Sequence, residues 1–514
     1  MKKSVLISTM LFLTLFCLNV NAQMNEKIVE PTGLNALIEA VQNDFNTLGG
    51  DAVSNTKYIL RRGASYPYST NFNENFSLHV EAEEGDGPLP QILPVNTGQE
   101  APRMFRCEGD DLSMTYINLD YHCFDTDGNH IDNAPLRVKG VRGRQVAIGC
   151  IFDGQRIEVS RMDGPHQTLK LIDCMIRNNY TVNKWDKGTL LSLMGHSQDS
   201  LIIEGSTIFN SPCQLFTHGD TLDYGRMAKN TIHNIGGLFE LGVYANPPTT
   251  RGVIDFGATQ ELIIEDNIFY NVGWMGLPPG WADSMFVFDY NPTPTAMPPV
   301  FRNNNYYLEP DLAAANPDSA VLIGIFSPNM PGAIGQDGNI SEPLIFENAP
   351  GTGPCKEAIA RFFAAPDTAI FEELRLDDSI SNVDVDFSYT GALSPTAGTT
   401  GGPLGAPRWD ATTSAVASRA AQPSSFELLG NYPNPFNPST NIRFNLSAPS
   451  RVTVKVYDTL GRMVLKTSEI EMAAGSRKVT IDGNDLASGV YFYQVNAQSA
   501  NAVNTANGRM LLLQ

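Results

Sequence analysis

The amino-acid sequence predicts an all-β protein in which a solenoid of short parallel strands, a parallel β-helix, precedes a small β-sandwich. Two observations carry this prediction. Between residues 24 and 409, apolar strands followed by an Asn or Asp recur at intervals of 25, 32, 24 and 37 residues. The last ninety or so residues instead alternate apolar and polar side chains with period two. The first pattern is typical of solenoids, and the second is typical of half-buried strands.

The first 22 residues have the features of a cleaved signal peptide. Lys2 and Lys3 form a positive start, Val5–Leu18 is a short apolar run, and Val20-Asn21-Ala22 offers a small-residue cleavage site. The run is too short to cross a bilayer comfortably. We therefore expect residues 1–22 to be removed on the way through the periplasm, and no transmembrane segment in the mature chain.

The composition limits the partners of the protein. The 514 residues include 35 Lys and Arg against 55 Asp and Glu, a formal net charge of −20. This charge repels nucleic acid and anionic lipid, and it disfavours a polyanionic glycan unless cations or a local basic groove intervene. Six cysteines follow Cys17, without the CxxC spacing of a zinc site. Cys107 and Cys123 are the nearest pair for a disulfide, whereas Cys150 and Cys174 suit buried apolar positions.

The acidic and amide residues of the repeat have a structural explanation. A β-helix bends sharply between strands, and Asn tolerates the left-handed backbone conformation better than most residues. Stacked amides can also hydrogen-bond from one turn to the next. We therefore expect these side chains to shape corners rather than to bind sugar, which is the alternative. A TIM barrel and a propeller are disfavoured, because no helices alternate with the strands and the period is uneven. The positions are Asp153, Asn178, Asn210, Asn234 and Asn271.

Both ends of a solenoid need a cap, because its cross-section is apolar. Leu34–Leu48 has helical apolar spacing with Thr32 as N-cap, which predicts a helix over the first strands, Tyr58–Gly63 and Leu78–Ala82. A short helix is expected at Cys355–Phe363, before a segment rich in Gly and Pro. We place the β-helix domain at residues 23–409 and a flexible linker at 410–425.

Residues 426–514 predict an immunoglobulin-like β-sandwich of about seven short strands. Three prolines in Tyr432–Pro438 predict an ordered loop. The alternating apolar positions expected to face the core are Ile442, Phe444, Leu446, Val452, Val454, Val456, Val479, Ile481, Val490 and Phe492.

Motifs in this region resemble a known export signal. The segments Phe426–Thr440, Val456–Arg462, Leu486–Tyr491 and Arg509–Gln514 resemble the type A sorting domain carried by cargo of the type IX secretion system in Bacteroidetes-like bacteria. The resemblance implies export across both membranes, contact with the secretion machinery through residues 426–514, and a secreted or cell-surface location. It also implies that the domain is removed during export.

A second resemblance concerns the β-helix. Gly402–Trp409, which reads GPLGAPRW, resembles the ending of secreted pectate-lyase-like β-helix proteins of Bacteroidetes-type bacteria, and Tyr58–Pro67 and Asp220–Tyr224 are similar to the same group. The resemblance covers roughly residues 30–409 and implies a right-handed parallel β-helix. It suggests extracellular polysaccharide as the partner and Ca²⁺ as the cofactor if the protein is a lyase, although fold alone does not determine activity.

The densest cluster of charged and polar residues lies at 218–226. β-Elimination needs a neutralised carboxylate and a base, whereas inverting hydrolysis needs two separated carboxylates. Asp220, Asp223 and Arg226 are the catalytic candidates, and Lys229 and Trp274 are the substrate-binding candidates. The structural alternative is that the aspartates shape a turn and Arg226 pairs with one of them. Further candidates are the basic residues Lys139, Arg142, Arg144, Lys170, Arg177 and Arg251 and the aromatic Trp185 and Trp281.

Two functions from different classes follow. In the first, the solenoid is a polysaccharide-active enzyme, a lyase before a glycoside hydrolase. In the second, it is a non-catalytic surface protein that binds glycan or has a structural role. The resemblance and the charged cluster favour the first. The acidic charge and the lack of an established lyase motif favour the second.

Overall fold

The computed structural model describes much of the chain, with gaps that fall mainly between strands. The predicted signal peptide and residues 411–426 of the linker region lie outside the described part. The described residues are 24–95, 104–123, 134–155, 158–179, 189–193, 195–217, 220–238, 250–275, 284–292, 296–316, 322–326, 338–364, 385–410, 427–432, 436, 438–446, 449–458, 462–472, 475–484, 486–499 and 503–512.

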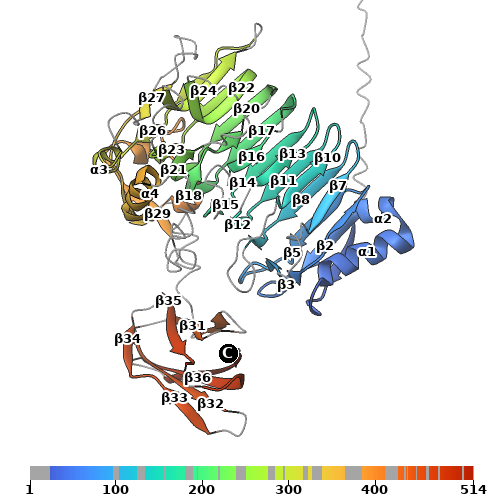
Figure 1. The fold of residues 1–514 in the computed structure, drawn as a ribbon, viewed down its shortest axis with the longest axis vertical. Helices are drawn as coiled ribbons and strands as arrows, with labels where there is room; N and C mark the ends of the chain where they lie inside the picture. The colour runs from blue at the N-terminus through green and yellow to red at the C-terminus, as the bar shows by residue number, and fades with distance from the viewer. Residues whose placement is uncertain are drawn as a thin grey trace, which may run out of the picture.

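Three sheets of parallel strands make up the first part of the chain (Figure 1). Sheet A contains β1 (Asn25–Val29), β2 (Thr56–Leu60), β5 (Leu78–Ala82), β8 (Ser113–Ile117), β11 (Arg144–Ile148), β14 (Thr168–Ile172), β17 (Gln198–Glu204), β20 (Thr221–Ala228), β22 (Thr250–Glu265), β24 (Ser284–Pro292), β25 (Val300–Arg302) and β27 (Leu322–Phe326). Sheet B contains β3 (Ser65–Tyr68), β6 (Gln91–Pro94), β9 (Asp120–His122), β12 (Ile151–Asp153), β15 (Met175–Arg177), β18 (Thr207–Cys213), β21 (Thr231–Leu238), β23 (Ile268–Val272) and β26 (Asn305–Tyr307). Sheet C contains β4 (Phe72–Glu74), β7 (Phe105–Glu108), β10 (Leu136–Lys139), β13 (Glu158–Met162), β16 (Thr189–Ser192) and β19 (Phe216–Thr217).

From β5 to β20 the chain visits sheets A, B and C in turn, and each strand pairs with the strand one turn later. In sheet A, for example, Val146 pairs with Lys170, which pairs with Ile202. The alternate residues, such as Leu169 and Leu201, point into one apolar core that runs through the stack. The predicted right-handed parallel β-helix is confirmed.

Four asparagines of sheet B confirm part of the sequence explanation. Asn178 directly follows β15, whereas the other three lie within β18, β21 and β23. Asn178, Asn210, Asn234 and Asn271 have φ between 55° and 58°, in the left-handed region. Their amides also link neighbouring turns, since Asn271 Nδ2 donates to Asn234 Oδ1 at 3.2 Å. Asp153 is the exception, because Gly154 takes the left-handed position in its turn of the helix.

A second asparagine ladder, between sheets A and B, was not expected from the sequence. Asn267 is fully buried, and its Oδ1 accepts hydrogen bonds from N and Nδ2 of Asn230, both at 2.9 Å. Asn304 and Asn339 repeat the arrangement in the following turns. In the preceding turn Ser206 donates its amide to Asn230 Oδ1 at 2.9 Å. The ladder fixes the stacking register of successive corners.

The N-terminal cap is a helix, as expected, but its start was predicted wrongly. Helix α1 (Ala36–Leu48) has Asn35 at its N-cap, and a second helix, α2 (Gly50–Ser54), follows. Thr32 was the wrong cap because the chain turns at Asn35, whose φ is 65°, before the helix begins. Leu37, Ile38 and Val41 are buried against the first turns, whereas Leu34 and Leu48 are exposed.

The far end folds back over the outer face of sheet B. Helix α3 (Pro310–Ala313) and the expected α4 (Gly353–Ala364) precede a segment from residue 385 to 410, here called the strap. The strap contains β29 (Asp386–Thr390), which pairs with β28 (Ile345–Asn348), and two 3-10 turns, Ser394–Thr396 and Pro407–Trp409. Trp409 Nε1 donates to Thr207 Oγ1 at 2.6 Å, and Ala406 N donates to Thr231 Oγ1 at 3.0 Å.

The GPLGAPRW motif therefore has a packing role. Gly405 has φ 86°, and an added Cβ would lie 2.6 Å from Thr231 Oγ1. Arg408 pairs with Asp173 at 2.9 Å and so holds the end of the strap to the corner between sheets A and B.

The cysteines lie in the interior. All six that are described are buried, as expected for Cys150 and Cys174. Cys107 lies on β7 of sheet C, whereas Cys123 follows β9 of sheet B and donates its thiol hydrogen to Gln155 Oε1. The disulfide considered from sequence proximity is not formed, because the two residues belong to different sheets. Burial raises the pKa of the Cys107 thiol to about 12.

The C-terminal part is a sandwich of two antiparallel sheets. One contains β30 (Glu427–Tyr432), β31 (Ser439–Leu446) and β35 (Gly475–Asp482). The other contains β32 (Ser450–Tyr457), β33 (Met463–Lys466), β34 (Ile470–Met472), β36 (Gly489–Ser499) and β37 (Val503–Leu512). Phe436, a described residue of the proline-rich loop, is buried and forms an isolated β-bridge with Leu512.

The side chains of β36 point the opposite way from the prediction. Val490 and Phe492 are exposed, by 38% and 47%, and Tyr491, Tyr493, Val495 and Ala497 face the core. The strand alternates two apolar sets, so hydrophobicity alone does not choose the buried one. The other eight predicted core positions are buried.

Candidate functional site

The sequence-predicted catalytic residues lie on or next to one strand of sheet A. Asp223 and Arg226 belong to β20, and Asp220 directly precedes it. Both aspartates are exposed, and Asp220 Oδ2 accepts a hydrogen bond from Ser197 Oγ at 3.0 Å. The structure thus places the three residues along one strand and its N-terminal flank, but it does not pair Arg226 with either aspartate.

Arg226 instead belongs to an ion-pair chain across the outer face of sheet A. Its Nε lies 2.5 Å from Glu204 Oε1, and its Nη1 lies 2.7 Å from Glu265 Oε1. Arg302 pairs with the other oxygen of Glu265 at 2.6 Å. Burial alone lowers the pKa of Arg226, but hydrogen bonds to the two glutamates outweigh it and raise that pKa. A guanidinium held in this way is a poor proton acceptor.

The two predicted substrate-binding residues differ in their exposure to solvent. Lys229 is exposed and occupies a left-handed corner with φ 54°, where its amide donates to Glu265 O at 3.1 Å. Trp274 follows β23 and is only 3% exposed, so its ring does not present a face to solvent. Asn316 Nδ2 donates to the Trp274 carbonyl at 2.7 Å.

The remaining candidates are scattered over the surface. Lys139 lies on sheet C, Arg144 and Lys170 on sheet A, and Arg177 on sheet B. Arg142 is exposed and pairs with Asp111 at 2.6 Å. Trp185 and Trp281, and the side chain of Arg251, lie outside the described part.

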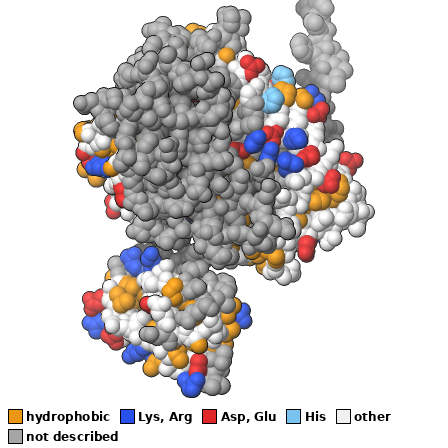
Figure 2. Space-filling model, in the orientation of Figure 1, with side chains coloured by type: hydrophobic (Ala, Val, Ile, Leu, Met, Phe, Trp, Pro, Cys, Tyr) orange, Lys and Arg blue, Asp and Glu red, His pale blue; other side chains and the backbone are white. Residues whose placement is uncertain are grey.

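A charged row on sheet C was not found from the sequence. Arg106, Arg137 and Arg161 occupy the same position on β7, β10 and β13, as the strand registers establish. We call these three residues the arginine row. Lys139 lies beside it, two residues after Arg137, and is exposed. Figure 2 shows Lys and Arg side chains next to Asp and Glu side chains on this face, over the region of β7 and β10 in Figure 1.

Carboxylates hold the row in place. Asp163 bridges two arginines, with Oδ2 at 2.6 Å from Arg137 Nε and Oδ1 at 2.7 Å from Arg161 Nε. Glu158 lies 3.5 Å from Arg161 Nη1. Burial alone raises the pKa of Asp163, but Arg161 and Arg137 outweigh it and lower that pKa.

The row is only partly accessible. The side chains of Arg106 and Arg161 are each 24% exposed, whereas that of Arg137 is 9% exposed. Arg106 pairs with Glu108 on its own strand. Arg137 therefore supports the row from within, and Arg106 and Arg161 reach solvent.

A half-buried cluster lies on the outer face of sheet B. His122 Nε2 is 3.0 Å from Asp120 Oδ1, and its Nδ1 is 3.8 Å from Asp153 Oδ2. Arg177 Nη2 lies 2.9 Å from the same Asp153 oxygen. Burial alone lowers the pKa of His122, but the two carboxylates raise it above its ordinary value. The two carboxylates balance the charges of protonated His122 and Arg177, which suits a structural network.

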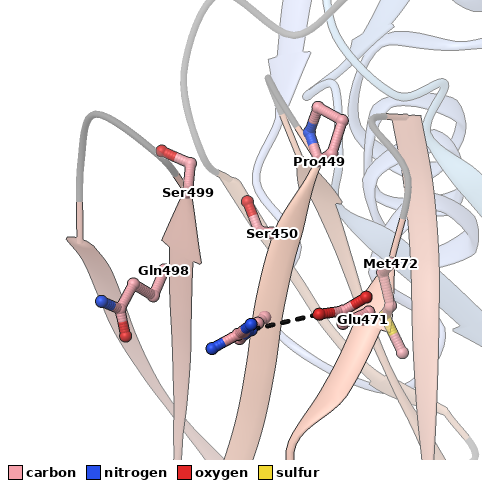
Figure 3. A pocket seen from close by; sticks show the side chains of 7 residues that line it. Pro449, Ser450, Glu471, Met472, Gln498 and Ser499 are labelled. Carbon is pink, nitrogen blue, oxygen red and sulfur yellow. Dashed lines mark hydrogen bonds and ion pairs between the residues drawn. The ribbon is translucent and has the colours of Figure 1, made fainter.

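The C-terminal sandwich carries a pocket of about 540 Å³ at one end of its five-stranded sheet (Figure 3). The ion pair of Arg451 and Glu471, 3.2 Å long, lies beside it, with both side chains more than half exposed. Such a pair contributes little to stability. We assign this pocket no chemistry. The lining residues are Pro449, Ser450, Arg451, Glu471, Met472, Gln498 and Ser499.

Comparison with known proteins identifies the C-terminal part. Residues 431–506 match the family described as the secretion system C-terminal sorting domain. This match supports export by the type IX secretion system. The protein is therefore exported and is secreted or held at the cell surface. The comparison with curated proteins gives no match.

The described residues contain neither a membrane-spanning helix nor a metal-binding group. No described helix is long and apolar enough to cross a membrane. Among the described residues, no three His, Cys, Asp or Glu side chains gather into a group that could hold a metal ion. Asp220 and Asp223 therefore belong to no such group of described residues.

Proposed function

We propose that the exported β-helix binds an acidic extracellular polysaccharide across the outer face of sheet C. The observation that carries the proposal is the arginine row, with one arginine in register on each of three successive strands. Neighbouring strands lie about 4.8 Å apart, so the row offers a regularly repeated cation along the solenoid axis. A repeating polymer of uronic acids, laid across the strands, is the ligand that such a row fits.

Guanidinium chemistry supports this choice of ligand. Arginine presents a planar fork of donors that matches a carboxylate, and it stays charged at any physiological pH. Arg106 and Arg161 are the accessible members, and exposed Lys139 adds a third cation nearby. The carboxylate of Asp163, whose side chain is 10% exposed, orients the guanidinium groups of Arg137 and Arg161 before any ligand arrives.

The local charge also supports the proposal. The outer face around the row carries Arg106, Arg137, Lys139 and Arg161 against Glu108, Glu158 and Asp163. It is therefore positive by one charge in a chain whose net charge is −20. A local basic groove is what the sequence requires if an acidic protein is to hold a polyanion.

A lyase is the second candidate, on a different observation. Asp220 and Asp223 are exposed carboxylates on or next to β20, where Arg226 and Lys229 also lie, and the motif Gly402–Trp409 is similar to that of pectate-lyase-like proteins. In that case Arg226 neutralises the uronate and a neighbouring side chain removes the proton. Because Arg226 is occupied by Glu204 and Glu265, binding without turnover is the form that the contacts favour.

The test compares arginine variants in binding to uronate polymers. Arg161→Gln and Arg106→Gln each remove a charged donor, while Arg137 still holds Asp163. Loss of one charged hydrogen bond of roughly 1.4 kcal/mol weakens binding about tenfold. The matched control is Arg61→Gln, which breaks ion pairs to Glu30 and Glu83 outside sheet C. Affinity electrophoresis of the full chain gives the dissociation constants. Equal weakening by all three variants, or by none, contradicts the proposal.

A further inference from the structure

The sorting domain places an apolar row on its outer surface. In the five-stranded sheet, Tyr457 on β32 pairs with Met463 on β33 and with Phe492 on β36. Val490 lies two residues before Phe492 on the same face and pairs with Leu511 on β37. Met463 is 54% exposed and Phe492 is 47% exposed. We call Tyr457, Met463, Val490, Phe492 and Leu511 the docking face.

Such a surface is unusual in a folded domain. Large apolar side chains that adjoin one another on the outside of a soluble protein mark interaction sites more often than isolated ones do. Aromatic residues and Met are also the types enriched at interface centres. The tyrosine ring between Met463 and Phe492 makes the face continuous across three strands.

Cations border the docking face. Lys455, the residue two before Tyr457, pairs directly with Lys466 across the neighbouring strand. Like charges directly opposite each other in a sheet are destabilising. Among the described residues, no carboxylate lies within ion-pair distance of either lysine. Arg509 pairs in register with Phe492 and adds an exposed cation on the other side.

The charge of the whole sorting domain differs in sign from that of its cargo. Residues 426–514 contain eight Lys and Arg against six Asp and Glu, whereas the rest of the chain contains 27 against 49. A receptor lined by carboxylates therefore attracts the sorting domain and repels the β-helix. Charge complementarity of this kind selects the correct surface and speeds the encounter.

We infer that the docking face binds a protein of the export machinery whose apolar groove is edged by Asp and Glu. Phe492 and Met463 enter the groove, and Lys455, Lys466 and Arg509 meet its acidic edge. The pocket beside Arg451 lies at the other end of the same sheet, since Arg451 pairs with Gln498 while Tyr457 pairs with Phe492. The two ends of one sheet therefore supply the test and its controls.

The experiment is an export assay with the full chain in a bacterium that has this secretion system. Phe492→Ser removes the centre of the face, and the double variant Lys455→Glu/Lys466→Glu reverses its edge. Because central aromatic residues contribute most of the binding energy of an interface, export of Phe492→Ser falls by at least about tenfold, with accumulation in the periplasm. One matched control is Ile470→Ser, which is 38% exposed at the pocket end. The other is the double variant Arg451→Glu/Lys478→Glu, which combines a residue of the pocket end with an exposed lysine of β35 in the other sheet.

Thermal unfolding of the purified full chains separates docking from folding. The lysines are surface residues, so the double variant keeps the wild-type transition even if Phe492→Ser does not, and its export decides the matter. Wild-type export of the double variant, or equal loss in the controls, overturns the inference. A dimer in solution that Phe492→Ser dissociates, with export unchanged, assigns the face to a second copy of the chain instead. Polysaccharide binding by the variants stays at the wild-type level, because the arginine row is untouched.

Discussion

Replacement of Asn267 by Ala tests the buried ladder that locks the corners of the β-helix. Asn267 Oδ1 accepts two hydrogen bonds from Asn230, and its Nδ2 lies 3.0 Å from Met227 O and 2.9 Å from Asn304 Oδ1. The side chain is fully buried, so water does not replace these partners without entering the core. The substitution thus leaves the Asn230 amide N–H without an acceptor and removes three further hydrogen bonds.

The magnitude follows from these contacts. An orphaned buried donor costs roughly 1–3 kcal/mol, and each lost hydrogen bond adds about 1 kcal/mol. We expect Asn267→Ala to lower the free energy of unfolding by about 4–6 kcal/mol. Asn267→Ser should lose about half as much, because Ser206 occupies the same column and its Oγ accepts the Cys174 amide at 3.1 Å.

Urea unfolding of the full chain, followed by circular dichroism, measures the effect as a shift of the midpoint. Asn46→Ala, at an exposed position of α1, is the control and should leave the free energy of unfolding unchanged within about 0.5 kcal/mol. A loss below about 1 kcal/mol for Asn267→Ala, or equal losses for Ala and Ser, refutes the reasoning.

Three further predictions concern the strap and the ion-pair chain. His233 is buried against aromatic rings, and this burial lowers its pKa to about 3. The unfolded chain therefore binds a proton that the folded chain does not, and the free energy of unfolding falls by about 1.4 kcal/mol per pH unit below pH 6.5. Urea midpoints of wild type and His233→Phe at several pH values check this, and an equal dependence of both midpoints on pH contradicts it. Gly405→Val forces a Cβ against Thr231 Oγ1 and should speed proteolysis of the strap at least about tenfold at 25 °C, whereas an unchanged rate removes the packing role of the motif. Arg226→Ala leaves buried Glu265 with a single ion-pair partner and should lower the free energy of unfolding by about 1–3 kcal/mol. Loss of polysaccharide turnover with an unchanged unfolding midpoint would instead support a catalytic role for Arg226.

The sequence predicts the architecture because its signals are local. Asn178, Asn210, Asn234 and Asn271 each mark a corner by their own backbone preference, and no knowledge of the other turns is needed. The second asparagine ladder could not be predicted from such local signals. Asn230 and Asn267 share their column with Cys150, Cys174 and Ser206, so residue type does not reveal that they stack.

The candidate site is predicted less well, since it depends on register between turns. Arg106, Arg137 and Arg161 stand 31 and 24 residues apart, and only the strand pairs of sheet C show that they align. The cluster around β20 is dense in sequence, but Arg226 finds Glu204 and Glu265 on neighbouring turns instead of Asp220 or Asp223. Charge density along the chain identifies reactive residue types, and three-dimensional neighbours decide their use.

The most direct test of the central claim presents the full chain with a panel of uronate and neutral polysaccharides. Retention on each polymer and the ultraviolet absorbance of unsaturated products are followed together, with calcium and then with chelator. We expect salt-sensitive retention of the protein on uronate polymers, little retention on neutral polymers, and no gain of ultraviolet absorbance. Equal retention on neutral polymers, or none on any polymer by folded protein, contradicts a polysaccharide site at the arginine row.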